Sequence, residues 1–281
     1  HFFVQKTKRP ALKPDPPKMP QTYSIEFEEV GKDALQIMDG YAQCVVDGKL
    51  VASRLVNLAC QRHRRDRIDK TLFFDLAQVG SWLAFTRKLP HVVGQAAERG
   101  EYFEPLPWQV FCLGSMLGWH HVEDGRRRYK LGLIEVARGN GKTTLMAGVA
   151  LWASLHGAGR ETYVFANTQR QALKCYRTAQ FMARGIAPDE LPHARGEKRC
   201  WQGREFTLTT NTIADQKNRN IMSAIPAKEG SLDGLDPFCF IADESSEYET
   251  RALQKLTTAT VTDNQPDEYL GPSGPNSAAS L

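Results

Sequence analysis

The stretch from Val136 to Thr144 reads Val-Ala-Arg-Gly-Asn-Gly-Lys-Thr-Thr and joins a short apolar run to a helical pattern that extends to Leu155. A strand, a glycine-rich turn and a helix in this order are typical of a phosphate-binding loop. Glycines let backbone N–H groups converge on phosphate oxygens, and the start of the helix adds the positive end of its dipole. The stretch therefore predicts a P-loop (Walker A motif) that binds the phosphates of a nucleotide.

The polar residues of this loop have expected roles. Lys142 would reach the β- and γ-phosphates, and the Thr143 hydroxyl would ligate Mg²⁺. Arg138 is open to two interpretations, because its charge either stabilises the γ-phosphate or braces the loop. The nucleotide-binding residues predicted within the loop are Arg138, Gly139, Asn140, Gly141, Lys142, Thr143 and Thr144.

The loop departs from the common P-loop pattern at one place. That pattern has a glycine five positions before Gly141, where this chain has Val136. A Gly-Lys-Thr tripeptide is by itself a weak signal, and its alternative interpretation is an ordinary helix start with an exposed lysine. Further support for the P-loop must therefore come from elsewhere in the chain.

An acidic pair farther along the chain gives that support. Residues 238–242, Phe-Cys-Phe-Ile-Ala, form an uninterrupted apolar run, as expected of a strand buried on both faces. Asp243 and Glu244 follow directly, and two carboxylates at the end of a buried strand are costly unless they have partners. A solvated turn is the alternative interpretation.

In a P-loop ATPase, the first carboxylate of such a Walker B pair holds Mg²⁺ through water and the second activates the attacking water. Together with the loop, the pair predicts Mg²⁺-dependent ATP hydrolysis. The candidate catalytic residues are then Glu244, Lys142 and Arg138, and the candidate metal ligands are Thr143 and Asp243.

Helices and strands alternate around these motifs. The β-favouring residues 162–166 predict a strand, and Thr168 with Gln171 forms a capping-box signature for the helix that follows. Residues 206–208 and 238–242 are further strand candidates. This alternation favours a parallel α/β sheet flanked by helices. We expect a P-loop NTPase fold of the additional-strand, catalytic-glutamate type (ASCE, RecA-like).

The region before the loop is predicted to be mostly helical. Apolar positions predict a helix from Lys32 that ends at Gly48, a second helix over residues 51–67, and a third from Leu76 through Thr86 to a stop at Pro90. The expected regions are an extended Pro-rich arm (1–31), an N-terminal helical region (32–105), a P-loop ATPase core (106–265) and an unstructured Gly/Pro/Ser-rich tail (266–281).

Net charge, cysteine spacing and apolar run length indicate which kinds of binding partner the chain could have. The net charge of +4 permits a nucleic-acid partner without requiring one, because basic residues act by clustering. None of the six cysteines sits in a C-x-x-C pair, so the sequence indicates neither a zinc site nor a disulfide framework. No apolar run approaches the roughly eighteen residues that a transmembrane helix needs, so we expect no membrane partner.

Further stretches resemble, in order, the ATPase domain of tailed-phage terminase large subunits of the HK97-like type. A loop that lacks the first glycine but keeps Arg-Gly-Asn-Gly-Lys-Thr is similar to the variant phosphate loop of that family. The resemblance extends from about Lys32 to Gln265 and includes residues 40–50 and 61–63, 106–111 with 118–119, 126–130, 166–172 and 233–237.

This resemblance implies an ATP-driven motor that translocates double-stranded DNA into a procapsid. It implies a homo-oligomeric ring, expected to be a pentamer, that assembles on the portal protein, and a small terminase subunit that loads it. The location would be the host cell cytoplasm and transiently the procapsid, not the mature virion. Gln109 would contribute to adenine recognition. A nuclease domain of the ribonuclease-H type, which cuts concatemeric DNA, would follow Leu281 in the parent protein.

Other interpretations stay open from the sequence. A superfamily-2 helicase would need a second RecA-like lobe, for which the chain has no room, and an ATPase relic would act as a capsid-associated binding module without turnover. The basic runs 62–67 and 126–128 either contact DNA or form solvated helix ends. Trp108 and Trp119 are interpreted as packing residues.

Overall fold

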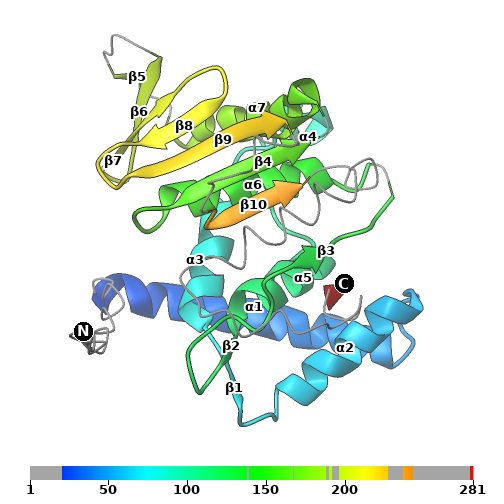
Figure 1. The fold of residues 1–281 in the computed structure, drawn as a ribbon. Coiled ribbons are helices and arrows are strands. Elements are labelled where there is room, and N and C mark those ends of the chain that lie inside the picture. The colour runs from blue at the N-terminus through cyan, green and yellow to red at the C-terminus, as the bar shows by residue number, and fades with distance from the viewer. Residues whose placement is uncertain are drawn as a thin grey trace, which may run out of the picture.

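The computed structural model describes residues 21–137, 139–166, 168–187, 190–191, 196–226, 237–242 and 279–280. Within this part of the chain, N-terminal helices pack beside a seven-stranded sheet that carries two helices on one face (Figure 1). The larger of two hydrophobic clusters runs through both the helices and the sheet, and a smaller one lies around Tyr163 and Phe165 of the sheet. The predicted phosphate loop, residues 136–144, therefore lies between two parts of the chain that pack against each other.

Helix α1 organises the N-terminal part, because it packs against α2, α3 and α5. Side chains cap two of these helices: Asp75 accepts from the N–H of Gln78 at 2.8 Å, and Ser53 accepts from the N–H of Val56 at 3.3 Å. The helices are α1 (Gln21–Val46), α2 (Arg54–Asp66), α3 (Leu76–Thr86), α4 (Gly94–Glu98) and α5 (Pro107–Gly118). A small antiparallel pair, β1 (Leu72–Phe74) and β2 (Trp119–His121), joins the start of α3 to the end of α5.

Two glycines allow α1 and α3 to cross closely. A Cβ on Gly80 would lie 1.7 Å from the carbonyl oxygen of Phe27, and a Cβ on Gly31 would lie 2.0 Å from that of Leu76. Any side chain at either position would therefore push the two backbones apart. Because α3 also contacts α6, the crossing connects α1 to the helices that cover the sheet.

The sheet has the strand order β10-β4-β9-β8-β7-β6-β5. Strands β10, β4 and β9 are parallel, and their register aligns Ile241 with Val164 and Val164 with Ala224. The remaining strands continue as an antiparallel meander. The strands are β4 (Glu161–Ala166), β5 (Glu190–Leu191), β6 (Glu197–Trp201), β7 (Arg204–Leu208), β8 (Thr212–Asp215), β9 (Asn220–Pro226) and β10 (Cys239–Ala242).

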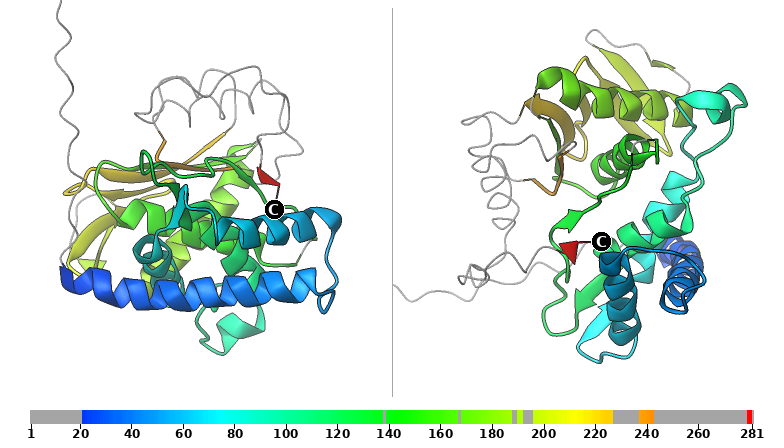
Figure 2. Two further views of the ribbon diagram at one scale, coloured as in Figure 1. Left: turned by 90° about the horizontal axis from the view of Figure 1, so that it is seen from below. Right: turned by 90° about the vertical axis from the view of Figure 1, so that its right-hand side faces the viewer.

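Helices α6 (Lys142–Leu155) and α7 (Gln169–Ile186) cover one face of this sheet. They contact each other and both contact β4 and β9, and Figure 2 shows them on the same side of the strands. Ten of the fourteen residues of α6 are buried, so this helix is the centre of the core. Its position fixes the loop that precedes it.

Several sequence predictions are confirmed. Helix α3 begins at Leu76 as predicted and ends at Thr86, before the predicted stop at Pro90; α6 ends at Leu155 as expected, and the strand expected over residues 162–166 is β4. The capping box at the start of α7 also forms: the Thr168 hydroxyl accepts from the N–H of Gln171 at 3.3 Å, and the Gln171 side chain accepts from the N–H of Thr168 at 3.0 Å.

Three predictions are wrong in part. The extended arm was expected to reach residue 31, but α1 begins at Gln21, since Gly31 is a helix-crossing glycine and not a break. Only two of the six strand pairings in the sheet are parallel, because hairpins build β5 to β8. The tail, expected to be unstructured, contains β11 (Ala279–Ser280), which pairs in parallel with β3 (Gly132–Leu133).

The crossing predicts opposite effects for two glycine substitutions. Gly80→Ala forces a Cβ onto a backbone carbonyl and should cost about 2–3 kcal/mol of unfolding free energy. Gly40→Ala, in the same helix layer but with no atom within 4 Å of the added Cβ, should gain about 0.5–1 kcal/mol. Urea denaturation of both variants measures this, and a neutral Gly80→Ala would contradict the close crossing.

Candidate nucleotide-binding site

The predicted phosphate loop adopts the backbone geometry that its glycines allow. Gly139 has φ +85° and Gly141 has φ +71°, both in the left-handed region that residues with a side chain rarely adopt. Gly141 is the N-cap of α6, and no side chain among the described residues caps this end of the helix. The first N–H groups of α6 are therefore available to an anion.

The side chains of Lys142 and Asn140 form hydrogen bonds within the loop. The ammonium group of Lys142 donates to the carbonyl oxygens of Val136 and Ala137, the latter at 3.2 Å. The side-chain amide of Asn140 also donates to the Ala137 oxygen, at 3.1 Å. The lysine charge thus lies over the loop, where the phosphates of a bound nucleotide would be.

Gln109 connects the loop to α5. Its side chain is buried, with 2% exposed, and its Oε1 accepts from the backbone N–H of Leu106 at 2.8 Å. Its Nε2 lies 3.9 Å from the position that a Cβ on Gly141 would occupy. Gln109 therefore lies beside the turn at the start of α6, and its expected contact with adenine stays a prediction.

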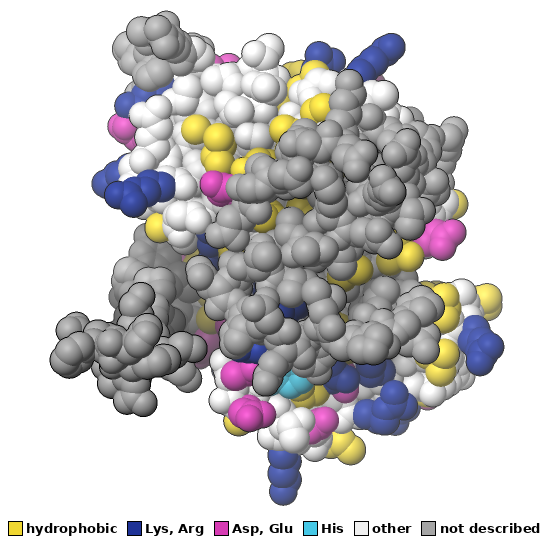
Figure 3. All heavy atoms as spheres, in the orientation of Figure 1, with side chains coloured by type: hydrophobic (Ala, Val, Ile, Leu, Met, Phe, Trp, Pro, Cys, Tyr) yellow, Lys and Arg dark blue, Asp and Glu magenta, His cyan; other side chains and the backbone are white. Residues whose placement is uncertain are grey.

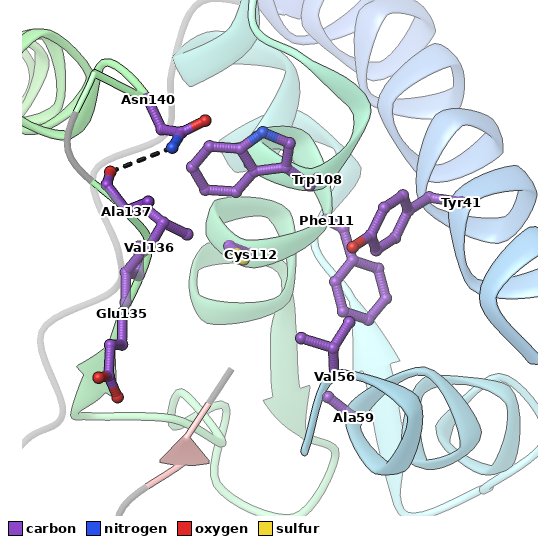
Figure 4. A pocket seen from close by; sticks show the side chains of 11 residues that line it. Tyr41, Val56, Ala59, Trp108, Phe111, Cys112, Glu135, Val136, Ala137 and Asn140 are labelled. Atoms are coloured by element: carbon purple, nitrogen blue, oxygen red, sulfur yellow. Dashed lines mark hydrogen bonds between the residues drawn. The ribbon is translucent and has the colours of Figure 1, made fainter. Parts of the chain in front are cut away.

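A cavity of about 310 Å³ opens beside the loop. Figure 4 shows Trp108 next to Asn140 at one end of the cavity and Tyr41 next to Phe111 at the other, where their ring centroids are 5.2 Å apart. The cavity wall comes from α1, α2, α5 and residues 134–140. Its full lining is Tyr41, Val56, Ala59, Trp108, Phe111, Cys112, Ile134, Glu135, Val136, Ala137 and Asn140.

The aromatic end of this cavity is uncharged. Burial raises the pKa of Tyr41 to about 12 and that of Cys112 to about 12, so both side chains stay protonated at neutral pH. Sequence analysis interpreted Trp108 as a packing residue, but the half-buried indole lies at the phosphate loop. In the sequence, the only sign that Trp108 lies at the loop is its position next to Gln109. Trp119, in contrast, is a core residue with 2% exposed.

The acidic strand ends at the edge of the sheet where α6 begins. A short connection joins the end of α6 to the start of β4, and the helix packs along that strand, so the two run in opposite directions. The start of α6 therefore lies at the carboxyl end of β4 and of the parallel strand β10. The chain leaves β10 at Ala242, and the next residues, Asp243 and Glu244, lie outside the described part, as does Arg138.

Thr143 and Thr144 belong to the first turn of α6 and are partly exposed there. The backbone oxygen of Thr143 lies 3.9 Å from the Cys175 sulfur of α7, a contact that holds the two helices together. The structure thus brings the described candidates of the loop to one helix end.

The basic runs have internal partners. Arg128 pairs with the buried Asp66 at 2.5 Å, and Arg67 pairs with Asp39 at 3.2 Å. Arg62 lies over the ring of Tyr129, at 5.0 Å from its centroid. These contacts favour a structural role for much of the charge in residues 62–67 and 126–128.

Comparison with known proteins shows the family of this chain. The model of the family described as "Terminase large subunit, ATPase domain" matches residues 107–273, which include both the loop and the acidic pair. Since the match covers more than half of the chain, the chain belongs to this family.

One solved structure, the crystal structure of the HK97 bacteriophage large terminase, is similar with a TM-score of 0.46 and 18% sequence identity. The similarity covers 65% of this chain and 35% of that chain, so this chain spans only a part of the length of that protein. No curated protein matches. Within the described residues, the helices are too short or too polar to cross a membrane.

Two glycine substitutions at positive φ should distinguish a loss of stability from a loss of ATP binding. Gly141→Ala and Gly203→Ala both place a side chain at positive φ, +71° and +76°, and each should cost about 1–2 kcal/mol of unfolding free energy. Only Gly141→Ala should also weaken ATP binding, by about ten-fold or more, the equivalent of 1.4 kcal/mol. Equal ATP affinity of the two variants, measured by calorimetry, would exclude the loop from the site.

Proposed function

We propose that this chain is a Mg²⁺-dependent ATPase and the motor domain of a viral terminase large subunit, which drives double-stranded DNA into a procapsid. The observation that carries the proposal is the uncapped start of α6 behind two left-handed glycines, within the segment that the terminase ATPase family model matches. This arrangement offers backbone N–H groups and a lysine to one anionic group.

The nucleotide binds with its phosphates on residues 139–144 and its base toward Trp108. Phosphate oxygens take over the two hydrogen bonds that Lys142 now gives to loop carbonyls. The aromatic cavity adjoins the loop and has a volume within the range of ligand sites. Gln109 lies at the junction of the two, beside the turn.

Thr143 and Asp243 would hold Mg²⁺. A hydroxyl in the first turn of α6 and a carboxylate after β10 belong to the same sheet edge and are oxygen ligands of the kind that Mg²⁺ prefers. When bound, the ion neutralises charge on the β- and γ-phosphates. Glu244 accepts a proton from the attacking water, and Lys142 and Arg138 stabilise charge on the γ-phosphate, with loop bracing as the other role of Arg138.

The fold that we propose is the additional-strand type of P-loop ATPase. Among the described residues, β10 is an edge strand of the seven-stranded sheet, and β3 pairs only with β11. An additional strand between β3 and β10 would join the P-loop to the sheet. The regions 32–105 and 106–265 would then act as the helical wall and the ATPase core of one unit.

The proposed assembly, partners and location concern the full packaging complex. We propose that the domain works in the host cell cytoplasm as a homo-oligomeric ring, taken as a pentamer, on the portal protein, after loading by a small terminase subunit. The parent protein would also cut concatemeric DNA with a separate nuclease domain. These proposals rest on family membership.

Substitutions at Lys142 and Glu244 should separate binding from turnover. Lys142→Ala should abolish productive ATP binding, because the loop loses its only lysine charge. Glu244→Gln should keep nucleotide affinity but stop hydrolysis. Nucleotide titration and a phosphate-release assay measure both. Normal turnover in Glu244→Gln would remove Glu244 from the catalytic role, and absent turnover in the unmodified chain would favour the relic.

The cavity predicts a contribution of Trp108 to base recognition. Trp108→Ala should weaken binding of ATP by about ten-fold, since stacking of a base on an aromatic ring is worth about 1–3 kcal/mol, and should leave binding of inorganic tripolyphosphate unchanged. Tyr102→Ala, which removes an aromatic ring with 66% exposed that does not line the cavity, is the control. An equal loss for both ligands would place the base elsewhere.

A further inference from the structure

One face of α7 carries a row of cations. Arg170, Lys174, Arg177, Phe181 and Arg184 follow each other at alternating spacings of four and three residues, which places them along one line of the helix. Arg170, Lys174, Arg177 and Phe181 are exposed, and α7 contains no acidic residue. We call the line from Arg170 to Arg184 the α7 stripe.

The opposite face of α7 explains why the stripe faces solvent. The buried residues of the helix, among them Ala172, Tyr176 and Ala179, pack against α6 and the sheet. Figures 1 and 2 show α7 at the end of the molecule far from α1. The stripe is therefore an outer surface of the sheet layer.

Within the described part of the chain, no carboxylate pairs with Arg170, Lys174 or Arg177. Arg184 differs, because its guanidinium binds Glu197 through Nε at 3.1 and 3.0 Å. Among the described residues, three cations of the stripe thus have no acidic partner, and the fourth shares its charge with Glu197.

This row of charge does not help the helix. Like charges three and four residues apart repel each other, and Arg170 and Lys174 lie near the amino end of α7, where the helix dipole disfavours cations. The basic run of α2 is different, because it occupies the carboxyl end of its helix, where cations are favourable, and Arg67 and Arg128 nearby have acidic partners. Figure 3 shows hydrophobic and basic side chains next to one another where α2 lies.

A groove runs beside the stripe. It has a volume of about 450 Å³ and is lined by Arg177, Gln180 and Arg184 of α7 and by Gly196, Glu197, Leu208, Thr209 and Thr210. The one carboxylate among these residues, that of Glu197, accepts hydrogen bonds from Arg184 and Arg199. Thr210 is exposed, so its hydroxyl is accessible from the groove. The groove thus adds neutral hydrogen-bonding groups to the cations.

We infer that the α7 stripe and this groove bind the phosphate backbone of double-stranded DNA without sequence preference. The three unpaired cations span about 10.5 Å of helix at 1.5 Å per residue. Phosphates of one DNA strand repeat about every 3.4 Å along the duplex axis, so the span matches about three phosphates. The inference rests on the proposed function for its ligand, but its surface is separate from the nucleotide site.

The test compares two triple variants with the same change of charge. Arg170→Gln/Lys174→Gln/Arg177→Gln neutralises the stripe, and Arg54→Gln/Arg64→Gln/Arg65→Gln neutralises exposed cations of α2. Binding of a short labelled duplex is measured by fluorescence anisotropy over a range of salt concentrations, without nucleotide. The stripe variant should lose about two to three units of the slope of log K against log salt, since each phosphate contact contributes about 0.9. The α2 variant should keep the slope of the unmodified chain.

Two further readouts separate binding from folding. Neutralising the stripe removes repulsion between like charges, so the melting temperature of the triple variant should not fall below that of the unmodified chain. The variant Lys174→Arg, which keeps the charge, should keep the affinity for DNA. An unchanged slope in the stripe variant, or an equal loss in the α2 variant, would overturn the inference, as would a chain that binds no duplex. ATP turnover without DNA is measured in parallel, and its absence from the unmodified chain would overturn the proposed ATPase, whatever the DNA data show.

Discussion

Burial of α6 is the constraint on which the candidate site depends. The helix is surrounded by α3, α7 and the sheet, and the indole N–H of Trp152 donates to the Ser81 hydroxyl of α3 at 3.2 Å, so its position is set by contacts along its length. Only its first turn reaches the surface. A helix held in this way presents its free N–H groups at a fixed place, and two glycines let the chain enter it at positive φ. A scaffold of this kind would hold the candidate phosphate site in place without a ligand.

The N-terminal helices give this site its wall. The close crossing of α1 and α3 positions α5, whose Gln109 lies beside the turn and whose Trp108 borders the cavity. Residues far apart in the sequence thus form one continuous surface from the aromatic cavity to the lysine. We interpret the helical region as part of the candidate nucleotide site and not as a separate module, which agrees with the large hydrophobic cluster shared by the helices and the sheet.

Local signals in the sequence predicted the parts of the fold that depend on neighbouring residues. The glycine turn before α6 and the capping box at Thr168 each involve residues within a few positions, and both form. Long-range packing decided the rest. The role of Gly31 depends on its contact with α3, and the place of Trp108 depends on α1, α2 and the loop. Of the meander, only the strand at residues 206–208 was predicted, because short hairpin strands such as β8 carry little periodic signal. The spacing of the α7 stripe was present in the sequence, but its orientation toward solvent required the packing of α7.

The central claim is that the open start of α6 binds the phosphates of ATP. Amide hydrogen exchange of the chain with and without a non-hydrolysable ATP analogue and Mg²⁺ tests it most directly. The account predicts slower exchange on nucleotide addition at the amides of residues 139–145, with a smaller effect around Trp108, and no change across the β6–β8 meander. Exchange that is unchanged at residues 139–145 while another region becomes protected would contradict it.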